Sequence, residues 1–338
     1  MALPTPAKAG AQVQRTRDGI LCLKAARNWA PAFAGVALGA LPAGCATAPV
    51  GSTVTTSLPV EADAEAPLGR GPTGGVIVGI LPAPQAPPET VPPAYQYLYG
   101  SGEAGALQLS AFHALIAYVK DKVAHRPADS VVLADGSPLV KARFVPCGAK
   151  PFAVVFDVDE TVLLNLGFEA RAAAGVPYST ADWARWEATG GGAVAATPGA
   201  EHAIDDLSKL GVAVVFNTNR RDAAATAATL KAVRLGEGKP GDTLLVQEPD
   251  GPGKDARRAQ VAARYCVLAM VGDQLGDFAD AFNASMPVAE RRQLAIHGSA
   301  AGLWGKGWFV LPNPVYGTAL KGGTDDVFPA DKSWSPDK

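Results

Sequence analysis

The sequence has few histidines, no basic stripe and no long apolar run, and each shortage argues against a class of protein. Its four histidines are scattered along the chain. None stands in an Arg-His-Gly context and none has the spacing of zinc ligands, which argues against phosphohistidine chemistry and against a zinc site. Surface or core packing is the expected role of all four, which are His113, His125, His202 and His297.

The charge balance is close to neutral, with 30 basic and 32 acidic residues and a formal net charge of -2. Because no basic stripe accompanies this balance, the sequence does not predict binding to a nucleic acid polymer. The chain has 338 residues, of which 48% are hydrophobic and 18% are charged. That is enough for one sizeable core and a smaller appended module.

The N-terminal region has the pattern of an export signal at residues 1–48. A positive cluster is followed by an uncharged segment that runs from Asn28 to Val60. The apolar part is too short, and too rich in Gly and Pro, for a good membrane span. The positive cluster consists of Arg15, Arg17, Lys24 and Arg27.

Two processing sites compete within this signal. The stretch "LPAGC" resembles a bacterial lipoprotein signal that ends at Cys45, although Pro42 stands where that pattern has Leu. Lipidation at Cys45 would anchor the protein to a membrane. Ordinary cleavage after "ATA", at Ala48, would instead give a soluble exported protein. The expected location is therefore the periplasm or, for the lipoprotein, the outer membrane.

The rest of the chain divides by composition. Residues 49–93 are rich in Pro, Gly, Ala and Thr, which predicts an extended linker that holds a domain away from a membrane, or a tail without function. A folded domain is expected at 94–330, with a polar tail at 331–338. It begins with a helix at 103–125, in which Leu107 and four or five later apolar residues recur at helical spacing.

Strand-like and helix-like segments alternate through the domain, which predicts a doubly wound parallel sheet with helices on both faces. A small, mainly helical cap is expected as an insertion at about 162–200. The expected later helices lie at 221–235 and 254–265. The expected strands lie at 152–158, 212–218, 243–247, 266–273 and 308–312.

Polar residues gather where these strands end, which is where active groups lie in such sheets. Asp157 and Asp159 follow the first strand in the stretch "AVVFDVDETVLLN", and this acidic crowding is electrostatically expensive. Thr218, Asn219 and Arg220 follow the next strand, and Asp273 and Asp277 follow a later one, with Lys254 at the start of a helix between them. Taken singly, each group is explained by a helix cap, a turn or a solvated helix face. Their joint occurrence in order favours a catalytic site.

These residues lie in motifs that resemble those of the haloacid dehalogenase-like (HAD) phosphohydrolase superfamily. A closer resemblance, from Tyr95 to Tyr316, is to the class C bacterial acid phosphatases, which are exported HAD enzymes and often lipoproteins. It is carried by "YQYLYGSGEAGALQLSAF", "DWARWEATGGGAVAATPGA" and "WFVLPNPVYG". The superfamily motifs are "DVDET" at 157–161, "NTNR" at 217–220, "KDARR" at 254–258 and "GDQLGDF" at 272–278.

The chemistry of phosphoryl transfer fits the same residues. Asp157 is the expected nucleophile, because a carboxylate can take up a phosphoryl group once a cation screens the approach of two anions. Mg²⁺ is the expected cofactor, held by Asp157, by the backbone carbonyl of Asp159 and by Asp273, with Asp277 positioning Lys254 or a metal-bound water. The Asp159 carboxyl would give a proton to the leaving group and then take one from water.

The remaining predicted site residues would bind the substrate. Thr218 and Lys254 would hold the phosphoryl oxygens, and Asn219 and Arg220 belong to the same substrate site. Members of the similar family accept nucleoside monophosphates, and two aromatic residues, Trp183 and Tyr316, would stack the base. Trp186, which shares a helix face with Trp183, is expected to pack inward.

Two questions stay open at this level. Cys147 and Cys266 precede strands that are neighbours in the HAD sheet, so they form either a disulfide or two buried thiols. The favoured function is a magnesium-dependent phosphomonoester hydrolase of the envelope that acts on small phosphomonoesters such as nucleoside 5'-monophosphates. The alternatives are a binding lipoprotein on a phosphatase scaffold and a phosphotransferase.

Overall fold

The computed structural model describes residues 90–249, 251, 253–283 and 286–336. All of them belong to one compact unit, Ile77–Lys338. The predicted export signal at 1–48, including Cys45, lies outside the described residues, as does the predicted linker except for its last four residues. Among the helices that the structure describes, none is long and apolar enough to cross a membrane.

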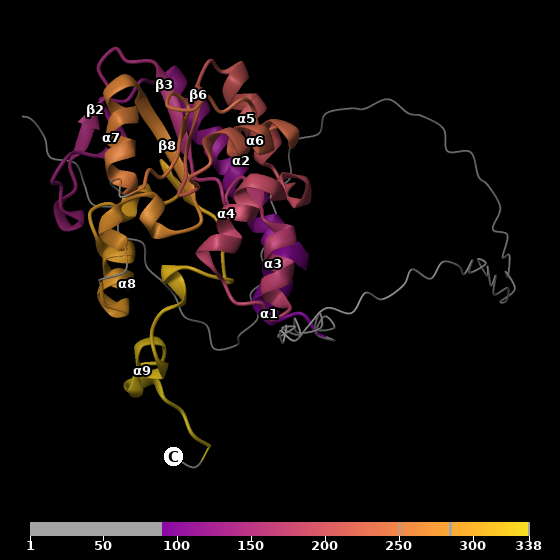
Figure 1. The fold of residues 1–338 in the computed structure, drawn as a ribbon. Coiled ribbons are helices and arrows are strands. Elements are labelled where there is room, and N and C mark those ends of the chain that lie inside the picture. Colours follow the sequence, from indigo (N-terminus) through magenta and orange to yellow (C-terminus); the bar gives the residue numbers. More distant parts are fainter. Residues whose placement is uncertain (1–89, 250, 252, 284–285, 337–338) are drawn as a thin grey trace, which may run out of the picture. The chain divides into compact units, whose positions relative to one another are not determined.

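A five-stranded parallel sheet forms the centre of the domain (Figure 1). Its middle strand is β3, Phe152–Phe156, which pairs on one side with β6, Ala213–Asn217, and on the other with β8, Cys266–Gly272. The outer strands are β7, Leu244–Leu245, and β9, Trp308–Val310. The order β7-β6-β3-β8-β9, with every pair parallel, confirms the predicted doubly wound sheet.

Helices cover both faces of the sheet, as predicted. Figure 1 shows α2, Gly102–Ala124, α5, Ala200–Lys209, and α6, Ala223–Ala232, on one side. On the other side lie α7, Lys254–Arg264, and α8, Val288–His297. Two buried apolar cores result, one on each face, and every residue of β8 is buried between them.

The first long helix shows where the periodicity argument went wrong. Its predicted inward face included Leu107, but the Leu107 side chain is 50% exposed. Ala104 and Gln108 are buried at that end of the helix instead, and Phe112 continues the buried face. The helix starts at an N-cap, because the Ser101 hydroxyl accepts a hydrogen bond from the backbone N–H of Ala104 at 3.1 Å.

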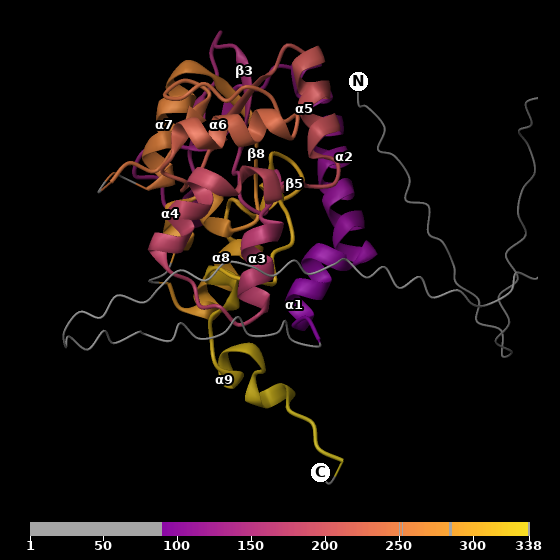
Figure 2. The same ribbon diagram turned by 45° about the vertical axis from the view of Figure 1, so that its right-hand side comes forward.

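Several secondary-structure elements were not predicted from the sequence. An antiparallel pair, β1, Asp129–Leu133, and β2, Phe144–Pro146, packs beside the sheet, and the Trp308 indole donates to the Val131 carbonyl at 2.9 Å. Before α2 come α1, Pro93–Tyr95, and a π-helix, Gln96–Gly100. Near the C-terminus, α9, Thr324–Val327, projects from the body in Figures 1 and 2. Short 3₁₀ helices complete the described fold at 139–141, 190–193, 275–277, 280–282, 301–303, 318–320 and 330–332.

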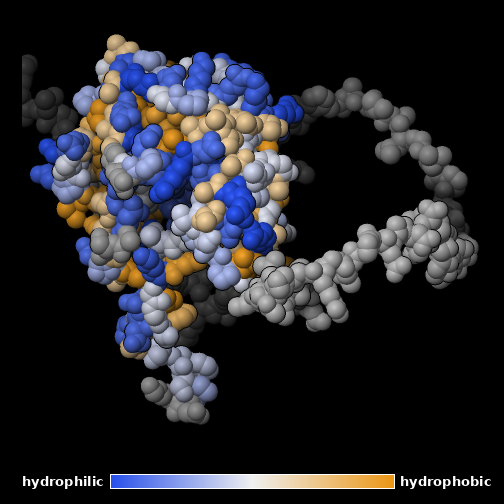
Figure 3. All heavy atoms as spheres, in the orientation of Figure 1, coloured by the Kyte–Doolittle hydropathy of each residue, from blue (hydrophilic) through white to orange (hydrophobic). Residues whose placement is uncertain are grey.

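A small cap follows the first sheet strand, close to the predicted insertion (Figure 2). Its base is an antiparallel pair of short strands, β4, Leu163–Leu164, and β5, Ala195–Ala196. Two helices rise between them, α3, Leu166–Ala173, and α4, Thr180–Thr189. Hydrophilic residues gather near the middle of the face in Figure 3, in the region of α4.

The structure decides the cysteine question in favour of a disulfide. Cys147 and Cys266 are bonded, with their Cα atoms 4.5 Å apart; Cys266 begins β8, at the end of that strand far from the predicted site, and Cys147 lies between β2 and β3. The bond joins residues separated by 119 positions, so it closes a loop that contains the whole cap. A crosslink across so long a loop restricts the unfolded chain strongly.

Removing this disulfide is expected to destabilise the domain without stopping catalysis. Replacing Cys147 and Cys266 together by Ala should lower the free energy of unfolding by about 2–5 kcal/mol. Urea denaturation of the wild type and of the double variant, each with and without a reductant, measures this change. Reductant should move the unfolding midpoint of the wild type toward that of the variant. Equal midpoints in all samples would contradict a stabilising crosslink.

Candidate active site

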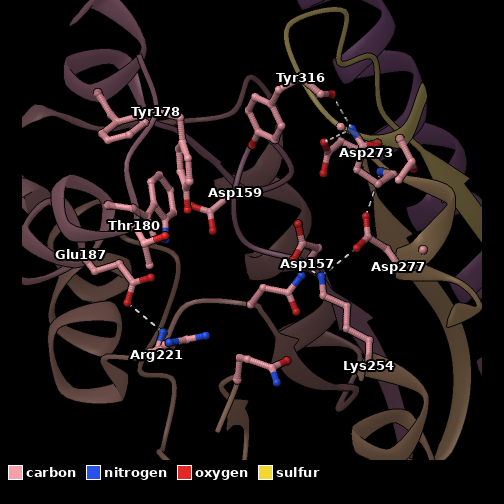
Figure 4. A pocket seen from close by; sticks show the side chains of 18 of the residues that line it. Asp157, Asp159, Tyr178, Thr180, Glu187, Arg221, Lys254, Asp273, Asp277 and Tyr316 are labelled. Carbon is pink, nitrogen blue, oxygen red and sulfur yellow. Dashed lines mark hydrogen bonds and ion pairs between the residues drawn. The ribbon is translucent and has the colours of Figure 1, made fainter. Parts of the chain in front are cut away.

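The register of the sheet brings the predicted clusters to one edge. Phe156, the last residue of β3, is paired with Phe216 of β6 and with Val271 of β8. Because these strands are parallel, the residues that follow them leave the sheet side by side. Asp157 and Asp273 therefore lie at the same edge (Figure 4).

Three carboxylates and one ammonium meet at this edge (Figure 4). Asp157, Asp273 and Asp277 each offer an oxygen, and these atoms lie within 4.8 Å of one another. Lys254, the first residue of α7, is buried between them. Its Nζ donates to Asp277 Oδ1 at 2.7 Å and to Asp157 Oδ1. Asp277 thus contacts Lys254, as one of its two predicted roles requires.

Burial dominates the electrostatics of this cluster. It raises the pKa of Asp157 well above the ordinary aspartate value; the Lys254 ammonium opposes that shift, and Asp277 and Asp273 add to it. Burial and the Asp277 charge raise the pKa of Asp273 to about 7. Burial alone would lower the pKa of Lys254, but its two carboxylate partners outweigh it and raise that pKa. The site therefore holds excess negative charge that favours a cation.

A ring of neutral donors fixes the carboxylates. The Thr161 hydroxyl donates to Asp273 Oδ1 at 3.1 Å and lies 3.5 Å from Asp157 Oδ2. The side-chain amides of Asn313 and Gln274 donate to Asp273 Oδ2 at 2.7 and 3.0 Å. The sequence analysis missed these three roles, although Thr161 is the last residue of the "DVDET" motif and Gln274 lies in "GDQLGDF".

This donor set fits a divalent metal ion. Carboxylate oxygens are the ligands that Mg²⁺ prefers, and Asp157, Asp273 and Asp277 supply them from two strand ends. The Asp159 carboxylate lies outside this cluster of three. Coordination by the Asp159 backbone carbonyl stays a prediction.

Asp159 is held instead by a buried arginine. Arg220 Nε donates to Asp159 Oδ1 at 2.9 Å, and Arg220 Nη2 donates to Asn165 Oδ1 at 2.8 Å. The Asn165 amide also donates to Asp159 Oδ1 at 2.9 Å. Arg220 is only 2% exposed and does not line the cavity, so its placement suits the positioning of Asp159 rather than the predicted contact with substrate.

Two other residues of the "NTNR" motif differ in whether they line the cavity. Thr218 is fully buried, its hydroxyl accepts the backbone N–H of Arg220 at 3.1 Å, and it is not on the cavity wall. Asn219 lines the cavity, and its Oδ1 accepts from Arg257 Nη2 at 3.0 Å. This orientation leaves the Asn219 amide N–H groups for a ligand.

The cluster lies in a cavity of about 920 Å³ between the sheet edge and the cap. Trp183 and Tyr316 both line it, as the base-stacking prediction requires. Trp186 does not; its indole donates to Asn165 Oδ1 at 3.0 Å, which fits the expected inward packing. Tyr178, which the sequence analysis did not single out, also lines the cavity and is 66% exposed (Figure 4).

Glu160 joins the cap, the C-terminal loop and the N-terminal π-helix. It is fully buried in a left-handed backbone conformation with φ 52°, which is strained for a residue with a side chain. Its carboxylate accepts from the hydroxyls of Tyr99 and Tyr316 and from the backbone N–H of Asn165. Burial and the nearby Asp159 charge raise the pKa of Glu160 to about 7.

Comparisons with known proteins agree with this architecture. Residues 108–319 match the acid phosphatase family of the HAD superfamily, subfamily IIIB. The fold is similar to that of the class C acid phosphatase from Bacillus anthracis, with a TM-score of 0.56 and 23% identity over 67% of this chain and 84% of that one. A structure of the Bacillus anthracis class C enzyme with tungstate bound gives a TM-score of 0.54 and 23% identity, over 72% of this chain and 96% of that one. No curated protein matches significantly.

Proposed function

The chain belongs to the acid phosphatase family of HAD subfamily IIIB, and on that premise we propose that it is a magnesium-dependent phosphomonoester hydrolase of the cell envelope. The observation that carries this proposal is the meeting of Asp157, Asp273, Asp277 and Lys254 in one buried cluster on the cavity wall. A nucleophilic carboxylate, a metal-binding set and a fixed cation are the parts that phosphoryl transfer requires.

The reaction begins at Asp157. A carboxylate oxygen of Asp157 attacks phosphorus, the bond from phosphorus to the leaving oxygen breaks, and an aspartyl-phosphate forms. Lys254 stabilises the negative charge on the transferring oxygens. A divalent cation held by Asp157, Asp273 and Asp277 would supply further charge neutralisation when bound.

Asp159 moves the protons in both steps. Its carboxyl gives a proton to the leaving alkoxide and later accepts one from the water that releases phosphate from Asp157, a role that contributes roughly 10²–10⁴-fold in rate. Arg220 and Asn165 occupy Oδ1 of this carboxyl, so Oδ2 is the oxygen left for proton transfer. Asn219, on the wall, would hold a phosphoryl oxygen through its amide.

Nucleoside 5'-monophosphates are the proposed substrates. Trp183 and Tyr316 supply aromatic surface on the cavity wall, and an aromatic ring stabilises a stacked base by roughly 1–3 kcal/mol. Trp183 also packs edge-on against Phe168, with ring centroids 4.9 Å apart, which fixes the orientation of its indole.

The proposed location rests on residues outside the described part of the chain. The export pattern at 1–48 supports a proposed location in the periplasm, or on the outer membrane if Cys45 is lipidated.

A phosphomonoester panel assayed with and without metal tests the proposal. Purified protein in Mg²⁺ should release phosphate from p-nitrophenyl phosphate and from nucleoside 5'-monophosphates. Chelation should abolish the release and renewed Mg²⁺ should restore it, because the buried carboxylates repel an anionic substrate without a cation. Binding of the esters without phosphate release would favour the alternative of a binding lipoprotein. Turnover undiminished by chelation would contradict metal dependence.

A further inference from the structure

One buried carboxylate on the cavity wall has no partner in the described structure. Glu169, in the cap helix α3, is 5% exposed and lines the cavity. Among the described residues, none donates a hydrogen bond to its carboxylate and none forms an ion pair with it. Burial raises the pKa of Glu169 to about 7, and the Asp159 charge contributes to this shift.

Each of the other buried carboxylates that line the cavity has a hydrogen-bond or ion-pair partner among the described residues. Asp157 has Lys254, and Asp273 has its ring of neutral donors. Glu187, from the neighbouring cap helix α4, accepts the backbone N–H groups of Arg221 and Asp222 at 2.8 and 3.0 Å. Because Glu169 faces the cavity, a ligand that displaces solvent from its carboxylate must supply a donor or leave the group buried and unpaired, which costs free energy.

The position of Glu169 indicates which part of a bound substrate it would contact. It belongs to the cap and not to the sheet edge that carries the metal-binding cluster. It lines the same cavity as Asp159, the group that serves the leaving oxygen. When the phosphoryl group lies on the cluster, the alcohol part of the ester therefore lies in the cavity that Glu169 lines.

On the basis of the proposed function, we infer that Glu169 is a specificity-determining residue that accepts a hydrogen bond from an O–H or N–H donor on the alcohol part of the substrate. Two kinds of ester supply such a donor. A nucleoside 5'-monophosphate carries ribose hydroxyls next to the phosphate, and the phosphate ester of an amino alcohol carries an ammonium group. An ester without a donor leaves the carboxylate buried and unpaired, which lowers its kcat/KM.

Two matched substrate pairs test the inference. The first pair is adenosine 5'-monophosphate and its 2',3'-dideoxy analogue, and the second is 2-aminoethyl phosphate and propyl phosphate. The wild type should prefer the donor-bearing member of at least one pair by about 10- to 100-fold in kcat/KM. Glu169→Met should bring that ratio close to one, and the pair that responds identifies the donor as hydroxyl or ammonium.

Controls separate the outcomes. Glu169→Ala keeps helix propensity and replaces the Met variant if that variant does not fold. Glu187→Gln changes a satisfied carboxylate of the same cavity and should leave both ratios as in the wild type. p-Nitrophenyl phosphate has no such donor, so its hydrolysis by the wild type tests the proposed function separately. If that ester is hydrolysed but neither pair shows a ratio that depends on Glu169, the inference is overturned.

Discussion

Asp157→Asn is expected to reduce phosphomonoester hydrolysis by about 10⁴-fold or more, the largest effect of any single substitution in this chain. The amide keeps the shape of the carboxylate but loses both its nucleophilicity and one metal-binding charge. The fold should persist, because Lys254 keeps its contact with Asp277 at 2.7 Å. Single-turnover and steady-state assays with p-nitrophenyl phosphate measure the loss.

A surface aspartate supplies the control for this substitution. Asp206 on α5 is half-buried, pairs with Lys209 at 3.2 Å and does not line the cavity. Asp206→Asn should therefore retain wild-type activity. Circular dichroism of both variants separates misfolding from chemistry. A folded Asp157→Asn protein with near wild-type turnover would assign the nucleophile to another residue.

Lys254→Met is expected to impair both catalysis and stability. Loss of one fixed cation at the transferring phosphoryl group should lower kcat by roughly 10²–10³-fold. Without metal, the variant also leaves Asp157 and Asp277 buried without their cation, and breaking a buried ion pair in this way costs about 3–5 kcal/mol. Urea denaturation in chelator measures the second effect, and added Mg²⁺ should restore part of the lost stability because the ion takes over the charge neutralisation.

Lys150→Met is the matched control, since it removes a lysine that serves only a backbone carbonyl. Lys150 Nζ donates to the Ala262 carbonyl at 2.6 Å and does not line the cavity. Its replacement should leave kcat unchanged, and Mg²⁺ should stabilise it only as much as it stabilises the wild type, whereas Lys254→Met should gain more. An equal response of the two variants to Mg²⁺ would show that the metal does not bind beside Lys254.

Local patterns along the chain were enough to predict the strands, the main helices and the polar residues at the strand ends. A strand buried on both faces, such as β8, is a continuous apolar run, and its end is marked where Asp273 follows Gly272. In a parallel sheet all such ends lie at one edge, so the meeting of Asp157 with Asp273 followed from local patterns alone. The helical face of α2 was predicted less well, because helical spacing cannot tell which of two adjacent apolar stripes meets the sheet. Leu107 is exposed for that reason.

Which polar residue pairs with which depends on how distant segments of the chain pack. Arg220 reads in the sequence as a substrate-binding residue, yet its guanidinium is buried against Asp159, which lies 61 positions away. Glu160 and Tyr316 are 156 positions apart and still share a hydrogen bond, and the Cys147–Cys266 bond spans 119. Spacing along a chain reports which face of one helix or strand a residue occupies, but a hydrogen bond between distant segments depends on how those segments pack. The unpaired carboxylate of Glu169 became visible for the same reason, since a missing partner can be recognised only when the surrounding side chains are in place.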